Sequence, residues 1–470
     1  MATGTALSHV FPLGSRVNER GHVEVGGCDT VELAREFGTP AYVVAEDDLR
    51  ARARACVQAG RDAGWADFQV VFASKAFPCT AVLSLFADEG LWCDVASGGE
   101  LHLALNAGFA PERVVMHGNA KSSAELEMAL KANVGLIAID NFDEIDRLVH
   151  LLSRSAHAPT GLAAHVRPGD EPHAARPSPT GENETEAVQG VLLRATPDVR
   201  GDTHEKISTG QADSKFGFSM GDLPTAIERV RAAAGLSLEG IHAHIGSQIL
   251  ELEPFRREVA ALVRIGERVG GLSIYDLGGG LGVAYGEDQR PPEIEEWVAA
   301  LVSCAREAGV APDARLLVEP GRALSANAGV TLYTVESVKR NVSTWVAVDG
   351  GMSDNMRPML YGSSYEAHLA DRPCWPIGDP VDRRSVATVT RCVLAGKHCE
   401  SGDVIVRDVP LDDPRPGDVI VTPVTGAYGY AMASNYNGVP RPPVVFCKDG
   451  DARVVVRRES FEDLTARDVR

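Results

Sequence analysis

Lys75 is the first residue of the sequence whose surroundings suggest chemistry, because it directly follows the apolar run "FQVVFAS". At the end of a buried strand its amine would be partly desolvated. Desolvation lowers the pKa of an amine, and an uncharged amine can form a Schiff base with a carbonyl compound. A lone lysine at a strand end is usually a surface charge, so this interpretation needs partner residues elsewhere in the chain.

Two later motifs could hold a phosphate. In "DLGGGLG", three glycines would let backbone amides approach a phosphate closely: Gly278, Gly279 and Gly280. The dinucleotide pattern is not met, because Val283 stands where its last glycine belongs. The second motif, "EPGR", adds a carboxylate and a guanidinium and consists of Glu319, Pro320, Gly321 and Arg322.

Two further strand ends carry titratable side chains: Asp94 in "WCDVASGGE", and His242 with His244 in "HAHIGS". Residues two apart on a strand face the same side of a sheet, so the histidines could share a metal ion. No third residue is persuasive as a ligand, and we expect no metal. An amine, a phosphate cradle, a carboxylate and a flat histidine together meet the needs of pyridoxal 5'-phosphate (PLP).

A thiol and an acid stand side by side in "LAGKHCESGD", as Cys399 and Glu400. The other eight cysteines are scattered without a C-x-x-C pair, which is typical of reduced, mostly buried thiols in the cytoplasm. The net charge of −19 argues against a nucleic-acid or anionic-membrane surface. We find neither an apolar run of membrane-spanning length nor a secretory signal.

The elements that must position these residues alternate between buried strands and amphipathic helices. Eight such units predict a parallel (β/α)8 barrel of the TIM type over residues 41–317, whose active site lies at the carboxyl ends of its strands. The strands are expected within residues 68–75, 92–100, 113–118, 135–140, 190–197, 238–247, 272–280 and 314–321.

The remaining sequence predicts a second domain. Residues 318–470 are rich in short β-like runs, and residues 1–40, with "HVEVGG", could add a strand to the same all-β, sandwich- or barrel-like domain. Residues 158–190 hold five prolines and interrupt the barrel pattern, so we expect a solvated, disordered insertion. We place the neighbouring strand at Val191–Thr196, which makes Arg194 a barrel residue and Arg167 a loop residue.

The order of these motifs resembles the diaminopimelate decarboxylases, PLP enzymes of the alanine-racemase fold group. The resemblance runs from about residue 70 to 440 and rests on "ASKAF", "CDVASGGEL", "HGNAKS", "HAHIGSQI", "DLGGGLG", "VEPGRA", "VDGGMSDNMRPMLYG", "GKHCESGD" and "GAYGYAMASNYN". It implies decarboxylation of meso-2,6-diaminopimelate at its D centre to L-lysine and CO2, the last step of lysine biosynthesis.

The resemblance also implies residue roles. Lys75 would bind PLP covalently, His244 would stack on its ring and Glu319 would pair with its pyridine nitrogen. Asp94 also belongs to the cofactor site. The phosphate would be held by Ser247, Gly278, Gly279, Gly280, Pro320, Gly321 and Arg322, with Tyr428 touching phosphate and substrate.

The same resemblance assigns the substrate end. Arg322, Arg357 and Tyr361 would bind the distal carboxylate. Cys399 would donate the proton that replaces CO2, and Glu400 would bind the distal amino group. Both come from the partner subunit in the family, which implies a homodimer with shared active sites.

Other functions stay open at this point. A related decarboxylase could act on ornithine, arginine or an amino acid tethered to a carrier protein, but a diamine-forming enzyme has no need of Arg357. An alanine racemase would leave "CESGD" without a task. A non-catalytic regulator of the same fold should have lost Lys75 or Cys399.

Overall fold

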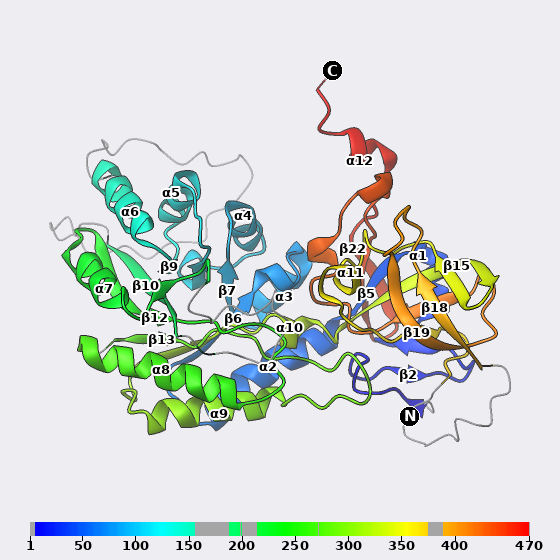
Figure 1. The fold of residues 1–470 in the computed structure, drawn as a ribbon, viewed down its shortest axis with the longest axis horizontal. Helices are drawn as coiled ribbons and strands as arrows, with labels where there is room; N and C mark the ends of the chain where they lie inside the picture. Colours follow the sequence, from blue (N-terminus) through cyan, green and yellow to red (C-terminus); the bar gives the residue numbers. More distant parts are fainter. Residues whose placement is uncertain are drawn as a thin grey trace, which may run out of the picture.

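A closed barrel of eight parallel strands forms the first part of the chain (Figure 1). The computed structural model describes residues 5–155, 188–197, 199, 214–270, 272–374 and 389–469. Each strand pairs with its neighbour, and the pairs β9–β10 and β14–β6 close the ring. The strands are β6 (Phe68–Ala73), β7 (Trp92–Val95), β8 (Val114–Met116), β9 (Leu136–Ile139), β10 (Gln189–Thr196), β12 (Leu236–His242), β13 (Ile274–Asp276) and β14 (Arg315–Val318). All eight expected strands are confirmed.

Helices cover the outside of the barrel, so the strands are buried on both faces and are apolar almost throughout. The helices are α2 (Glu46–Asp62), α3 (Thr80–Asp88), α4 (Gly98–Asn106), α5 (Ser123–Ala132), α6 (Phe142–Ser155), α7 (Leu223–Ala232), α8 (Glu253–Val269) and α9 (Ile294–Glu307). Ser122 caps α5 as expected, in a capping box with Glu125. The short strand β11 (Phe218–Ser219) adds to β10.

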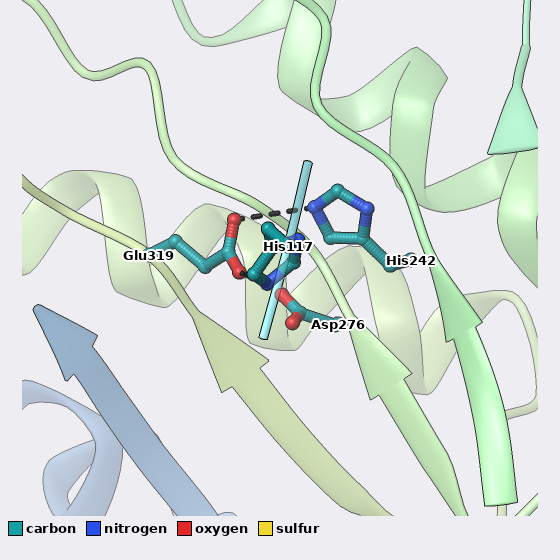
Figure 2. A group of neighbouring side chains, drawn as sticks. All are labelled: His117, His242, Asp276 and Glu319. Atoms are coloured by element: carbon teal, nitrogen blue, oxygen red, sulfur yellow. Dashed lines mark hydrogen bonds and ion pairs between the residues drawn. The ribbon is translucent and has the colours of Figure 1, made fainter. Parts of the chain in front are cut away.

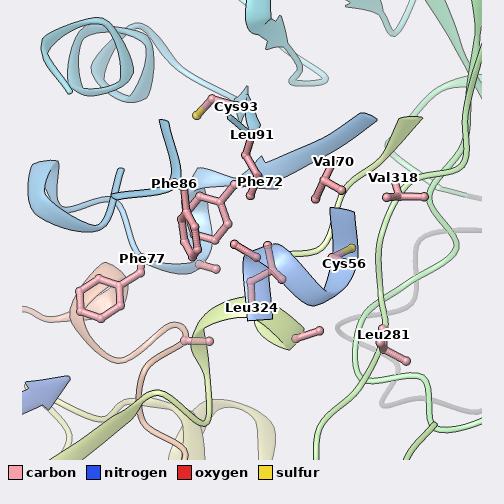
Figure 3. Packing of buried hydrophobic residues seen from close by; sticks show 14 of the residues in the cluster. Cys56, Val70, Phe72, Phe77, Phe86, Leu91, Cys93, Leu281, Val318 and Leu324 are labelled. Atoms are coloured by element: carbon pink, nitrogen blue, oxygen red, sulfur yellow. The ribbon is translucent and has the colours of Figure 1, made fainter. Parts of the chain in front are cut away.

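Aromatic and aliphatic side chains fill the space between strands and helices (Figure 3). Phe72 of β6 packs against Phe86 of α3 with their ring centroids 4.3 Å apart. Cys56 of α2 and Val318 of β14 belong to the same buried cluster. This packing holds the carboxyl ends of β6 and β14, where Lys75 and Glu319 follow, in fixed positions.

A β-rich region lies beside the barrel (Figure 1). Its sheet has the order β19-β18-β16-β15-β5-β21-β22, with β17 and β20 beside it. The strands are β5 (Ala41–Ala45), β15 (Gly329–Arg340), β16 (Thr344–Val348), β17 (His368–Leu369), β18 (Val389–Ala395), β19 (Val404–Asp412), β20 (Val419–Thr422), β21 (Val444–Lys448) and β22 (Asp451–Val456). Three short helices accompany them: α10 (Arg322–Ser325), α11 (Arg357–Tyr361) and α12 (Phe461–Thr465).

The expected barrel start at residue 41 is wrong. Residues 41–45 form β5, which pairs with β15 and β21 and not with any barrel strand. An apolar run of five residues suits either sheet, so the pattern alone could not assign it. The barrel begins with β6, and α2 leads into it.

The N-terminal residues form a small sheet of their own. Its order is β1-β2-β3-β4, from β1 (Thr5–Ala6), β2 (Arg16–Val17), β3 (Val23–Val25) and β4 (Cys28–Asp29), followed by α1 (Thr30–Phe37). The "HVEVGG" segment was expected to extend the large sheet, but it forms β3 within this separate one. The hydrogen bond from Val23 N to Ala370 O links it to the β-rich region.

Most of the expected insertion, including Arg167, lies outside the described residues. Its expected end at residue 190 is too late, because β10 already begins at Gln189. Arg194 lies in β10, as expected for a barrel residue. Within the described ranges, no helix is long and apolar enough to cross a membrane.

Candidate active site

A cavity of about 500 Å³ opens where the carboxyl ends of the barrel strands face the β-rich region. Nine of the site residues that the family resemblance implies line it: Lys75, Asp94, His244, Ser247, Glu319, Arg322, Arg357, Tyr361 and Tyr428. These come from strand ends that are far apart in sequence, and from α11 and the segment after β20. The fold thus brings the candidate amine, carboxylates and arginines together.

Lys75 lies at the end of β6 in a 3-10 turn (Ser74–Ala76), with its Nζ 3.2 Å from Asp94 Oδ2. The expectation that the pKa of Lys75 is lowered is wrong. Loss of hydration in the cavity lowers the pKa of Lys75, but the negative charge of Asp94 outweighs it and the pKa is raised. Lys75 is therefore an ammonium ion paired with a carboxylate, and must lose a proton before it can act as a nucleophile.

His244 follows β12 and faces the triple glycine. Its Nδ1 accepts a hydrogen bond from Gly279 N at 3.2 Å. Burial, together with the positive charges of Lys75 and Arg194, holds the pKa of His244 well below its usual range. The imidazole is therefore a neutral, flat ring at neutral pH.

The triple glycine is required by close packing. A Cβ on Gly278 would lie 2.3 Å from Ala243 O, and one on Gly280 would lie 2.3 Å from Gly246 O. Both residues also have positive φ values, which disfavour larger side chains. The three consecutive backbone units therefore lie against the ends of β12 and β14 as a side-chain-free surface.

Glu319 is the centre of a buried cluster (Figure 2). Its Oε1 lies 2.7 Å from His117 Nε2, and its Oε2 lies 3.2 Å from His242 Nε2. Burial raises the pKa of a carboxyl, but the two histidines outweigh this and hold the pKa of Glu319 well below its usual range. Burial also lowers the pKa of His242 to about 4. The cluster thus presents a fixed carboxylate oriented from both sides.

Asp276, at the end of β13, completes this cluster. Burial and the neighbouring Glu319 charge raise its pKa well above the usual range, so Asp276 is protonated while Glu319 is ionised. The sequence suggested His242 and His244 as the two histidines of a metal site. The structure instead groups His242 with His117, Asp276 and Glu319, whose potential ligand atoms all lie within 4.8 Å of one another.

Two buried arginines form the opposite wall. Arg322 donates from Nη2 to Ser247 Oγ at 2.9 Å, and Arg357 donates from Nη2 to Ser363 Oγ at 3.1 Å. Each is about 5% exposed or less. The ring of Tyr428 lies 4.8 Å from the Arg322 Cζ and 5.7 Å from the Arg357 Cζ. Two guanidiniums beside one cavity can bind a carboxylate by paired hydrogen bonds.

Some expected site residues do not line this cavity. Gly278, Gly279, Gly280, Pro320 and Gly321 shape the strand ends beside it. Cys399 and Glu400 lie on the β-rich region, where Cys399 is exposed. The backbone N of Cys399 donates to Asn437 Oδ1 at 2.9 Å, and the cavity of the same chain contains neither side chain.

Sequence reasoning missed several lining residues, among them His117, Asn119, Lys215 and Phe216. His117 directly follows β8, so the rule that gave Lys75 and Asp94 would also have found it. The Phe216 ring lies 4.2 Å from the Arg194 Cζ and 4.9 Å from Lys215 Nζ. Only the folded structure brings these three residues together.

The donor set fits PLP. Lys75 supplies an amine, Glu319 a fixed carboxylate for a pyridinium nitrogen, and His244 a neutral ring. The glycine surface leaves room where any side chain would collide with the neighbouring strand ends. Ser247 Oγ and Arg322 supply polar groups on the same cavity wall.

The comparisons with known proteins agree with this fit. Residues 47–326 match the family model "pyridoxal-dependent decarboxylase, pyridoxal binding domain". The barrel and its cavity are thus those of a PLP-dependent decarboxylase. The diaminopimelate decarboxylase of Actinosynnema pretiosum is 44% identical, over 98% of this chain and 95% of that protein. That of Halalkalibacterium halodurans is 41% identical, over 97% of each.

Among solved structures, diaminopimelate decarboxylase from M. jannaschii, in complex with L-lysine, superposes with a TM-score of 0.83. It is 29% identical and covers 97% of both chains. The chain belongs to the diaminopimelate decarboxylase family.

Proposed function

We propose that this protein removes the carboxylate at the D centre of meso-2,6-diaminopimelate, giving L-lysine and CO2, with PLP as cofactor. The two buried arginines of the cavity carry this assignment. A decarboxylase that forms a diamine has no second substrate carboxylate for Arg322 and Arg357 to bind. Burying the Arg357 guanidinium without an anionic ligand is costly, whereas a substrate with a distal carboxylate pairs with Arg357 and with Arg322.

The lining of the cavity supports a proposed role for each residue of the cofactor site. Lys75 holds PLP covalently, Glu319 pairs with its ring nitrogen, and His244 lies against its ring. Ser247, Arg322 and the glycine surface from Gly278 to Gly280 hold its phosphate, with Pro320 and Gly321 shaping the turn and Tyr428 beside it. When bound, PLP supplies an electron sink for the charge left on the substrate α-carbon.

The side chains of this chain supply orientation and proton handling. Asp94 Oδ2 can accept the proton that Lys75 Nζ must lose. His117 and His242 hold the Glu319 carboxylate in place, and its ionised state favours a protonated ring nitrogen. Arg322, Arg357 and Tyr361 hold the substrate carboxylate that is retained, which directs the other carboxylate toward the reacting end.

The replacement proton comes from Cys399 of a second subunit. Cys399 is exposed on the β-rich region and lies outside the cavity of its own chain. Glu400, its neighbour, binds the distal amino group of the substrate. We therefore propose a homodimer in which the β-rich region of each chain completes the site of the other. All nine cysteines are free, in keeping with a reducing cytoplasm.

A direct assay tests this function. Purified protein loaded with PLP and given meso-diaminopimelate should release CO2 and L-lysine in equal amounts. The matched Lys75→Ala variant should release neither, and borohydride should fix the cofactor to the wild type alone. Release of CO2 from ornithine or arginine, with none from diaminopimelate, would assign the alternative substrate class.

A further inference from the structure

A buried tyrosine behind the cavity wall joins the two arginines. Tyr285 is 7% exposed and does not line the cavity. Its phenol oxygen accepts a hydrogen bond from Arg322 Nη1 at 2.5 Å and another from Arg357 Nη1 at 2.8 Å. The two guanidiniums belong to elements 35 residues apart in sequence, α10 and α11. One oxygen atom therefore sets how close these two cations lie.

We propose that Tyr285 is a positioning residue that fixes Arg322 and Arg357 around a single substrate carboxylate. It does so without touching the substrate, since it lies behind both arginines. Each guanidinium uses one Nη1–H on Tyr285 and one Nη2–H on a serine, Ser247 or Ser363. Both forks are thereby held in a fixed orientation. This inference rests on the proposed function, because it concerns the retained carboxylate of that substrate.

Electrostatic repulsion explains why Arg322 and Arg357 need the Tyr285 oxygen as a shared acceptor. Two like charges held close together in a buried site repel each other strongly. An electron-rich oxygen placed between them offsets part of that repulsion. Burial raises the pKa of Tyr285, but Arg322 and Arg357 outweigh it and the pKa is lowered.

Tyr285 is held further by its backbone N, which donates to Gln289 Oε1 at 2.8 Å, and by a neighbouring aromatic ring. The ring of Tyr365 packs edge-on against that of Tyr285, with centroids 5.1 Å apart and the planes at 82°. Tyr428 lies near both guanidiniums from the cavity side. The phenol oxygen is thus surrounded by donors and rings, and a phenylalanine at residue 285 would fill the same space without accepting a hydrogen bond.

Ligand binding to PLP-loaded Tyr285→Phe tests the proposal. L-lysine keeps the carboxylate that the arginines hold, whereas 1,5-diaminopentane has the same chain and both amines but no carboxylate. Tyr285→Phe should weaken L-lysine binding about 10- to 100-fold, the effect of losing hydrogen bonds to charged groups. Binding of 1,5-diaminopentane should stay within about twofold of the wild type, since it does not use the arginines.

The control variant is Tyr275→Phe. Tyr275 is also a buried tyrosine, 5% exposed, but it lies in β13 away from the cavity lining. The Tyr275→Phe variant should bind L-lysine and 1,5-diaminopentane with the affinities of the wild type. Equal L-lysine binding in wild type and Tyr285→Phe, or an equal loss for both ligands, would overturn the proposal.

A spectroscopic titration gives a second readout. Tyrosinate absorbance should begin to rise below the ordinary tyrosine pKa of about 10 in the wild type and in Tyr275→Phe. That early phase should be missing in Tyr285→Phe, and its presence there would also overturn the proposal. Because ligand binding and titration do not depend on turnover, failure of the wild type to decarboxylate diaminopimelate would count against the proposed function alone.

Discussion

Arg357 is the single side chain on which the proposed substrate preference depends most. It is 4% exposed, and its guanidinium is held by Tyr285 and Ser363 with its remaining donors near the cavity. A substrate carboxylate bound there loses its hydration shell, and hydrogen bonds to the guanidinium replace it. Removing Arg357 takes away one of the two guanidiniums that balance this buried carboxylate.

Arg357→Ala should therefore cost about 2–5 kcal/mol in kcat/KM for diaminopimelate. Arg357→Lys keeps a charge but loses the two-pronged geometry, so it should recover only part of the loss. Steady-state kinetics measure both, with the absorbance of bound PLP as the check that the cofactor site is intact. An unchanged kcat/KM in Arg357→Ala would reject the role of this residue in substrate binding.

The sequence revealed many of these residues because of where they stand. Lys75 and Glu319 follow buried apolar strands, Asp94 is the penultimate residue of another, and a parallel barrel places such positions at one end. The sequence could not reveal that His117 and His242 would meet at Glu319, because that contact depends on closure of the ring by strands far apart in sequence. Nor could it give the sign of the Lys75 pKa shift, which depends on the 3.2 Å distance to Asp94.

At the scale of elements, the loop before α11 determines where Arg357 and Tyr361 lie. Asp354 anchors it: Oδ1 accepts from Tyr333 OH at 2.5 Å and Oδ2 from Gly351 N at 2.7 Å. Its backbone oxygen accepts from Tyr42 OH of β5 at 2.6 Å. The loop is therefore tied to two neighbouring strands of the large sheet. Burial raises the pKa of Asp354 to about 7, with the Tyr333 hydrogen bond opposing the rise.

This shift predicts a pH dependence. A carboxyl whose pKa is raised in the folded state stabilises the fold at low pH, and that contribution is lost as pH rises from about 4 through about 7. Asp354→Asn removes this titration. The urea midpoint of the wild type, relative to Asp354→Asn, should therefore fall between pH 5 and pH 8.

The lowered pKa of His242, about 4, acts in the opposite direction but is common to both proteins and cancels in the difference. A difference between the two midpoints that does not change over this range would show that Asp354 is ionised throughout it. Intact PLP binding in Asp354→Asn would show that the barrel itself is unaffected.

At the scale of the whole molecule, the proposed site needs two chains. Lys75→Ala removes the cofactor amine and Cys399→Ala removes the proton donor, so each homodimer should be inactive. Mixed subunits should form heterodimers in which one site is intact and the other lacks both groups. Random exchange makes about half of the dimers mixed, so activity should recover to about a quarter of the wild-type level.

Native mass spectrometry confirms subunit exchange in this experiment, and CO2 release measures the recovery. Exchange without recovered activity would mean that Cys399 acts within its own chain or has no part in the reaction. Mixing Lys75→Ala with Arg357→Ala is the control, because both residues line the same cavity of one chain. These two variants should not complement each other, because neither cavity of the heterodimer is intact. Cys399→Ala mixed with Arg357→Ala should instead gain one intact site.

The position of β5 has a consequence for the nascent chain on the ribosome. This strand is made before the barrel, yet its two partners, β15 and β21, follow the barrel, and β21 ends only at Lys448. During synthesis both edges of the apolar segment "AYVVA" therefore stay unpaired while the barrel strands emerge. Unpaired apolar strands are the segments that associate with other chains. Protein released early, before residue 444, would keep one such edge open, so premature termination near the C-terminus should yield aggregates despite a barrel whose strands are all present.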